Sequence, residues 1–224
     1  MAQATAICAG SLHICKARFT RLNSDGTFKS GANNHVVTDQ IVSLDFTPAI
    51  SAGASTEVIS GCDCIALSYR GFDKLLRLDL AFQLASLNPS LVELVTGSSL
   101  VVDASVIPVP IGNVFPNQLS CSNPTQPPVA VEVWSDAWQN DRAIDPPSRY
   151  VRWVFPMTFW QIDQSKLENN FFQPTYKGWT RQNPNWGNVY GDWPAGVTGP
   201  FTTSGYFWDT TQPASSCTYS TLST

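Results

Sequence analysis

The chain has 224 residues and a formal net charge of −4, and only 13% of its residues are charged. A typical soluble domain has about 25% charged residues, so we expect partners to cover much of this surface. Glu and Lys, which fill the exposed faces of helices, number only four and five. Their scarcity excludes a helical bundle and favours a mostly β chain. The acidic balance argues against a protein that grips nucleic-acid phosphates.

Strands joined by turns are predicted for the first half of the chain. Residues 14–22 alternate polar and apolar side chains, as a half-buried strand does. The segment 23–26 contains Asp-Gly and predicts a tight turn. Residues 41–48 predict a second strand, and residues 57–67 predict a third element that is broken by Gly61.

The strand predicted at 76–84 has the clearest alternation, with five large apolar side chains on one face. We expect this face and that of strand 41–48 to form the core, through Val42, Leu44, Phe46, Leu76, Leu78, Leu80 and Phe82. The opposite faces carry polar side chains, and such a face must meet water or a polar partner. These polar positions include Ser43, Asp45, Arg77, Asp79 and Gln83.

One short helix is predicted after this strand. Asn88 can cap its N-terminus, Pro89 suits the first helical position, and Gly97 suits the left-handed position after the last turn. Apolar residues recur at the spacing of one helix face, which predicts packing on the sheet. The residues expected in the core under this helix are Leu44, Phe46, Leu78, Leu80, Phe82, Leu91 and Leu94.

The second half differs in composition, since 14 of the 16 prolines and all eight tryptophans follow Ile107. Residues 108–128 predict a long irregular connection, because each Pro removes a backbone donor. Strands are predicted at 129–134, 150–160 and 171–180, with Pro156 marking an edge or a bulge. We expect residues 1–182 to form one β domain. Residues 183–224 have no hydrophobic period and predict an extended arm.

Enzymatic chemistry has little support in the sequence, and we predict neither catalytic residues nor a cofactor. Asp136 and Asp141 beside Trp134 and Trp138 leave open a carbohydrate-binding or glycoside-cleaving β-sandwich. The interpretation that we favour is a solvated loop anchored by Trp134. The basic residues in the first half alternate with acids and are expected to pair with them.

The six cysteines and the chain start give weaker indications. Cys8, Cys15, Cys62 and Cys64 leave open a tetrathiolate metal site, although no zinc-binding spacing occurs. The first residues lack the basic and apolar regions of a secretory signal, so reduced thiols are expected rather than disulfides. No apolar run approaches the 18 residues of a membrane-spanning helix, so we expect no membrane association.

The order of motifs resembles that of the major tail tube proteins of long, flexible-tailed (siphovirus-type) phages of actinobacteria. In the first half the resemblance rests on RFTRLNSDGTFKSGANNHVVTDQIVSLDFTP, ISGCDCIAL and LLRLDLAFQLASLNPSLVELVTGSS. In the second half it rests on VAVEVWSDAW, YVRWVFPMTFW and NPNWGNVYGDWP. The resemblance covers nearly the whole chain, with the motifs in the family's order.

This resemblance implies a tail-tube-type β-sandwich or barrel with one short flanking helix and extended loops. Hexameric rings of such subunits would stack into a tube through which DNA passes during ejection without specific binding. The implied partners are further copies of the chain, the tape measure protein, the tail terminator and the distal tail or baseplate proteins. The implied location is the virion tail, after assembly in the cytoplasm of the bacterial host.

Residues for this function follow from the predicted faces and loops. We expect the polar faces of the first-half strands to line the lumen, through Ser43, Asp45, Asp79 and Gln83. We expect the loop 26–38 and the C-terminal arm to contact neighbouring subunits or rings, through Gly26, Phe28, Asn33, His35, Trp186, Trp193 and Trp208. Another virion β-protein, such as a tail terminator or a decoration protein, remains an alternative.

Overall fold

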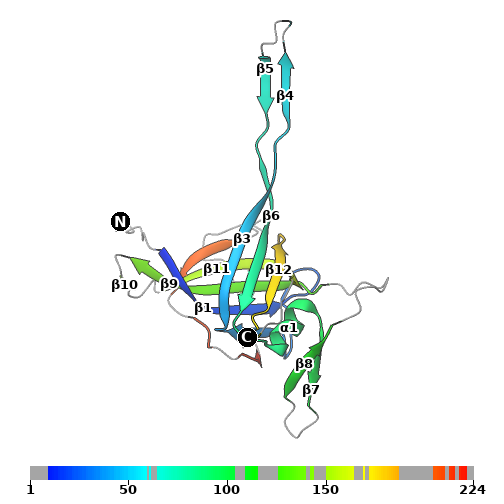
Figure 1. Ribbon diagram of the computed structural model, residues 1–224, viewed down its shortest axis with the longest axis vertical. Helices are drawn as coiled ribbons and strands as arrows, with labels where there is room; N and C mark the ends of the chain where they lie inside the picture. Colours follow the sequence, from blue (N-terminus) through cyan, green and yellow to red (C-terminus); the bar gives the residue numbers. More distant parts are fainter. Residues whose placement is uncertain are drawn as a thin grey trace.

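The computed structural model describes residues 10–59, 61, 65–103, 109–115, 126–139, 142–143, 150–163, 169, 172–186, 204–209, 212–214 and 217–220. These residues form a mostly β chain with antiparallel strand pairs and one short helix, as the composition predicts. A ten-stranded sheet has the order β14-β2-β1-β9-β11-β12-β6-β3, with β10 beside β9 and β13 beside β11. Two small hairpins, β4–β5 and β7–β8, extend from it (Figure 1).

The bounds of the elements are as follows. The main sheet contains β1 (Gly10–Arg21), β2 (His35–Thr38), β3 (Ile41–Ser51), β6 (Lys74–Leu84), β9 (Val129–Gln139), β10 (Arg142–Ala143), β11 (Tyr150–Ile162), β12 (Thr175–Thr180), β13 (Gly205–Asp209) and β14 (Tyr219–Ser220). The hairpins and the helix are β4 (Ser55–Ile59), β5 (Ile65–Arg70), β7 (Ser99–Val102), β8 (Pro110–Val114) and α1 (Pro89–Thr96).

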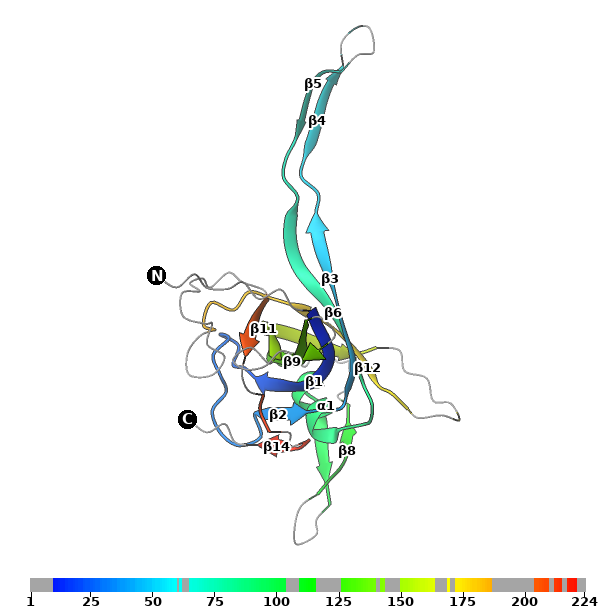
Figure 2. The ribbon, with the colours of Figure 1, turned by 90° about the vertical axis from the view of Figure 1, so that its left-hand side faces the viewer.

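The main sheet curls around its own apolar face (Figure 2). Phe46, on the terminal strand β3, has its ring centroid 5.5 Å from that of Trp153 on the central strand β11. The core inside this curl is centred on the buried ring of Phe82, whose centroid lies 4.6 Å from those of Trp160 and Tyr176. A single sheet therefore supplies both walls of the core.

A bulge at Pro156 produces part of this curvature. The pairing of β11 with β9 shifts register between Phe155 and Thr158, and beyond this point β11 pairs with β12 instead of β13. A proline inside a strand is tolerated at such a bulge because no ladder hydrogen bond is lost there. The prediction of an edge or a bulge at Pro156 is confirmed.

The helix α1 has the predicted caps. The side chain of Asn88 accepts a hydrogen bond from the backbone N–H of Leu91 at 3.1 Å, and Pro89 is the first helical residue. Gly97 has φ = 71°, and its N–H donates to the carbonyl of Glu93 at 2.9 Å. The apolar stripe of the helix is buried in the core of the sheet, so both the position and the packing of the helix are confirmed.

Part of the predicted core is wrong. Leu78, Leu80, Phe82, Leu91 and Leu94 are buried in one cluster, and Leu44 is partly buried against it. Phe46 is 46% exposed, because it lies where the terminal strand β3 leaves the curled sheet. Val42 and Leu76 are also exposed. A register shift between Ile41 and Ser43 places Ile41 in the core in place of Val42.

Two segments that the sequence predicts as irregular contain strands. Within 108–128, residues 110–114 form β8, where Pro110 occupies the first strand position and needs no ladder donor. Within 183–224, β13 pairs with β11 and β14 pairs with β2, so the described parts of this segment belong to the main domain. Strands of five and two residues are too short to show alternation, which explains the error.

A buried carboxylate ties three strands of the sheet together. Glu132 on β9 is 2% exposed, and its carboxylate lies 2.5 Å from a guanidinium nitrogen of Arg18 on β1. Arg152 on β11 is 3.8 Å from the other oxygen. The guanidinium of Arg18 also lies 5.4 Å from the ring centroid of Trp134, a cation–π distance. Two guanidinium groups thus share one buried carboxylate.

We therefore predict that Glu132→Gln lowers the free energy of unfolding by about 3–5 kcal/mol, because it leaves two guanidinium groups without their buried carboxylate. Urea unfolding followed by tryptophan fluorescence measures the change. The matched control is Asp79→Asn, which removes an exposed ion pair with Arg77 and is expected to cost less than about 1 kcal/mol. Equal effects of the two substitutions would contradict the structural role of Glu132.

Candidate assembly surface

A long β-ribbon projects from the main sheet (Figures 1 and 2). We call this ribbon the arm; it is a different segment from the C-terminal arm that the sequence predicts at 183–224. The described residues of the ribbon are 48–59, 61 and 65–78, which include the outer parts of β3 and β6 together with β4 and β5. Exposure along β6 rises from 2% at Leu80 to 9% at Leu78 and 64% at Leu76. The apolar row of this strand thus continues from the core into solvent without a change in sequence pattern.

The outer hairpin of the arm is amphipathic. Val58 pairs with Leu67 and Thr56 pairs with Tyr69, so these residues share one face. The intervening pairs present Ser55, Glu57, Ser68 and Arg70 on the opposite face. An isolated two-stranded ribbon is at best marginally stable in water, so the apolar face is expected to be covered in the assembled state. The large exposed apolar residues of the arm are Ile50, Val58, Ile59, Ile65, Leu67, Tyr69, Phe72, Leu75 and Leu76.

Two glycines form a joint midway along the arm. A Cβ atom at Gly53 would collide with the backbone of Gly71, so the two strands approach closely at this point. The carboxylate of Asp73 accepts a hydrogen bond from the N–H of Gly53 at 2.9 Å and lies 3.6 Å from the guanidinium of Arg70. These contacts fix the direction of the outer hairpin relative to its base.

The hairpin β7–β8 lies at the opposite end of the molecule from the arm (Figure 1). In this hairpin the side chains of Val102, Ile111 and Val114 are exposed. The side-chain amide of Asn113 donates to the carbonyl of Pro89 at 2.8 Å, which ties the hairpin to the start of the helix. The molecule therefore presents uncovered apolar ribbons at both ends of its long axis.

The four residues predicted to line a lumen share one face of β3 and β6. Ser43 lies opposite Gln83, and the next pairs on this face are Asp45 with Ala81 and Thr47 with Asp79. Ser43 and Gln83 are partly buried, whereas Asp45 and Asp79 are exposed. The register thus brings the four side chains together, but it does not show what this face meets.

Charges on this polar face are largely paired. The carboxylate of Asp79 lies 2.7 Å from Arg77, and Lys177 on the neighbouring β12 lies 2.9 Å from Asp163. Among the described residues of the face, Asp45 is the acid outside these two pairs. The face therefore carries a weak negative charge, and its two basic residues do not attract an anion strongly.

Three residues predicted to contact neighbouring subunits are instead buried within their own chain. Gly26 (φ = 87°) packs against Asn183, whose side-chain amide donates to the carbonyl of Gly26 at 2.9 Å. His35 lies in β2 between β1 and β14; its burial, aided by the positive charge of Arg18, lowers the pKa of its imidazole. Trp186 is buried with its ring centroid 5.5 Å from that of Phe28. Packing of the loop 23–34 onto the sheet overturns these assignments.

The other predicted contact residues have different outcomes. Asn33 is exposed, and Phe28 is half-buried beside Trp186. The backbone of Trp208 pairs with Val151 within β13, and Trp193 lies outside the described residues. Asn33 alone among these positions is shown to be accessible to a neighbour.

The structure weakens the sugar-binding alternative. Trp134 is buried beneath the Arg18 guanidinium and cannot act as an exposed aromatic platform. Asp136 is half-buried in β9, and Asp141 lies outside the described residues. Within the described part of the chain, no three His, Cys, Asp or Glu side chains are grouped to hold a metal ion. Cys8, Cys62 and Cys64 of the possible tetrathiolate lie outside this part.

The arm is the feature that sequence reasoning missed. Its signal was present as two β-rich stretches, 41–59 and 65–84, placed almost symmetrically around Gly61. Such symmetry is typical of a long hairpin. No helix in the described part of the chain is long and apolar enough to cross a membrane.

Comparison with known proteins identifies no family for this chain. No family model matches the sequence, and no curated protein matches it. The function must therefore be argued from the arm, the second hairpin and the polar face.

We predict that Leu67→Glu prevents self-association while leaving the thermal midpoint of unfolding within about 2 °C of the wild type. The substitution places a charge on the uncovered apolar face, which has no core of its own to lose. Sedimentation velocity measures the association. The matched control, Ser55→Glu, adds the same charge to the polar face of the same hairpin, opposite Arg70, and it is expected to associate as the wild type does. Loss of association in both variants would show that charge, rather than the apolar face, controls assembly.

Proposed function

We propose that this chain is a structural virion protein, the major tail tube subunit of a long-tailed phage, and that it forms stacked hexameric rings. The observation that carries the proposal is the pair of uncovered apolar hairpins at opposite ends of one subunit. When the surface at one end of a subunit meets the different surface at the opposite end of the next subunit, the contact is heterologous and repeats into a filament. The resemblance of motif order to tail tube proteins supports the same conclusion.

The free edge of the sheet supports ring formation. Among the described strands of the main sheet, β3 and β14 are the two ends of the order, and β3 has a neighbour on one side only. An open strand of eleven residues is a site for pairing with another chain. In a closed ring each such edge is paired, and no edge remains exposed. The low charge content of the chain agrees with a subunit whose surface is mostly covered.

The polar face of β3 and β6 is the surface that we assign to the lumen. Its weak negative charge repels DNA slightly, so DNA can slide past without binding. Ser43, Asp45, Asp79 and Gln83 supply this face. In this proposal the protein is neither an enzyme nor a cofactor carrier. Its partners are its own copies, the tape measure protein, the tail terminator and the distal tail or baseplate proteins, and its location is the virion tail.

Deleting the arm tests this proposal directly. Residues 51–74 can be replaced by Asn-Gly, because Ile50 and Leu75 are paired and a two-residue turn can join them. We expect the wild-type protein to form rings or tubes of uniform diameter in negative-stain micrographs. The deletion variant should remain folded, with its tryptophan fluorescence and unfolding midpoint retained, and should form no tubes.

Monomers of the wild type at all concentrations would contradict the proposal. Rings that never stack would instead favour a tail terminator, and binding to preformed particles would favour a decoration protein. Truncation after Thr180 is unsuitable as a test, because it removes β13 and β14 from the main sheet.

A further inference from the structure

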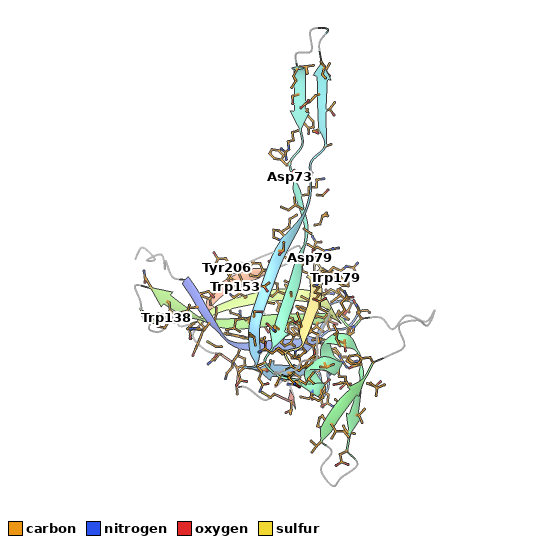
Figure 3. All side chains as sticks on the ribbon, in the orientation of Figure 1. Asp73, Asp79, Trp138, Trp153, Trp179 and Tyr206 are labelled. Carbon is orange, nitrogen blue, oxygen red and sulfur yellow. The ribbon has the colours of Figure 1, made fainter. Side chains whose placement is uncertain are left out.

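An aromatic cavity of about 350 Å³ lies at the root of the arm. Its apolar lining comes from β3, β6, β11 and β13, through Phe46, Leu78, Trp153, Phe155, Tyr206 and Phe207. Figure 3 shows Trp153 and Tyr206 together at this root. No charged side chain lines the cavity, so the described residues offer a site for an uncharged, apolar group.

The rings around the cavity contact one another and still remain open to solvent. The ring centroid of Trp153 lies 5.5 Å from that of Phe46 and 5.2 Å from that of Tyr206. Phe46 and Tyr206 are nevertheless exposed. Aromatic pockets of this kind become desolvated when an anchor residue of an interface enters them.

Phe72 is the most exposed large apolar residue in the described part of the chain, at 95%. It lies at the joint of the arm, between Gly71 and Asp73. The Asp73 carboxylate accepts a hydrogen bond from the N–H of Gly53, and the N–H of Gly71 donates to the carbonyl of Ala54 at 2.8 Å, so the residues on both sides of Phe72 are hydrogen-bonded to the opposite strand. Its ring thus projects from an ordered joint.

Within one subunit this ring and the cavity are apart. Figure 3 places Asp73, the neighbour of Phe72, midway along the arm, whereas Trp153 and Tyr206 lie at its root. An apolar projection and an apolar cavity that do not meet within one chain are complementary between two copies.

We propose that Phe72 of one copy inserts into the aromatic cavity of a second copy. The size fits, because a cavity of about 150 Å³ already holds benzene, and an inserted aromatic ring can make favourable ring contacts with an aromatic lining. The exposed apolar residues of the arm, at roughly 60–120 Å² each, supply about the 800 Å² per partner that a stable interface needs. The inference rests on the proposed self-assembly and names the contact that drives it.

The test uses two variants that each lose one half of the contact. Phe72→Ala removes the projecting ring, and Ser204→Trp fills the cavity from its rim. We expect each variant alone to be monomeric, with association weakened at least tenfold. In a 1:1 mixture, Phe72 of the Ser204→Trp copy can enter the open cavity of the Phe72→Ala copy. The mixture should therefore form heterodimers that do not grow further, which sedimentation velocity and mass photometry distinguish.

The control is Leu87→Ala, which truncates an exposed apolar residue outside the arm and the cavity and should associate as the wild type does. Phe72→Ala is expected to fold, since its side chain is almost wholly in solvent. Wild-type assembly of Phe72→Ala would overturn the proposal. If Phe72→Ala still forms tubes, the Phe72 contact is wrong and the proposed tail tube function stands. If the wild type forms dimers that depend on Phe72 but never forms tubes, the contact stands and the tail tube function is wrong.

Discussion

The arm depends on one constraint, which is that a two-stranded ribbon has no interior. The apolar row of β6 contributes Leu80 to the core, passes Leu78 at the boundary and reaches solvent at Leu76. Within the sheet this row is covered by the strands and by the helix that curl over it. Beyond the sheet the same row is exposed, so we expect another molecule to cover it. The core and the proposed assembly surface are therefore two parts of one continuous apolar face.

Several charged side chains near these apolar surfaces are paired with an opposite charge in the same subunit. The buried carboxylate of Glu132 lies between two guanidinium groups in the middle of the sheet, and Asp73 and Asp79 are paired with Arg70 and Arg77. Unpaired charges would resist burial against a partner, because desolvating an isolated charge is costly. Pairing of these charges within the subunit therefore lowers the cost of covering the neighbouring apolar surfaces.

Local signals in the sequence predicted local structure well. The caps of α1 at Asn88 and Gly97 follow from side-chain and backbone preferences of single residues, and the bulge follows from Pro156. The exposure of Val42, Phe46 and Leu76 could not be predicted, because alternation looks the same in a core strand and in a projecting ribbon. The register shift after Ile41 and the short strands β13 and β14 depend on long-range pairing. The aromatic cavity likewise joins four strands that are distant in sequence.

Successive residues of a strand point to opposite faces, and this alternation lets the same two strands serve two purposes. On β3 and β6, Phe46 and Leu78 share one face and line the cavity, and Leu78 is also part of the core. Asp45 and Asp79 lie on the opposite face. In the proposed tube, the first face binds the neighbouring subunit and the second meets the passing DNA. A substitution on one face therefore need not alter the other. Because the projecting ring and the cavity lie at different places on each subunit, the contact between copies also gives the assembly a direction.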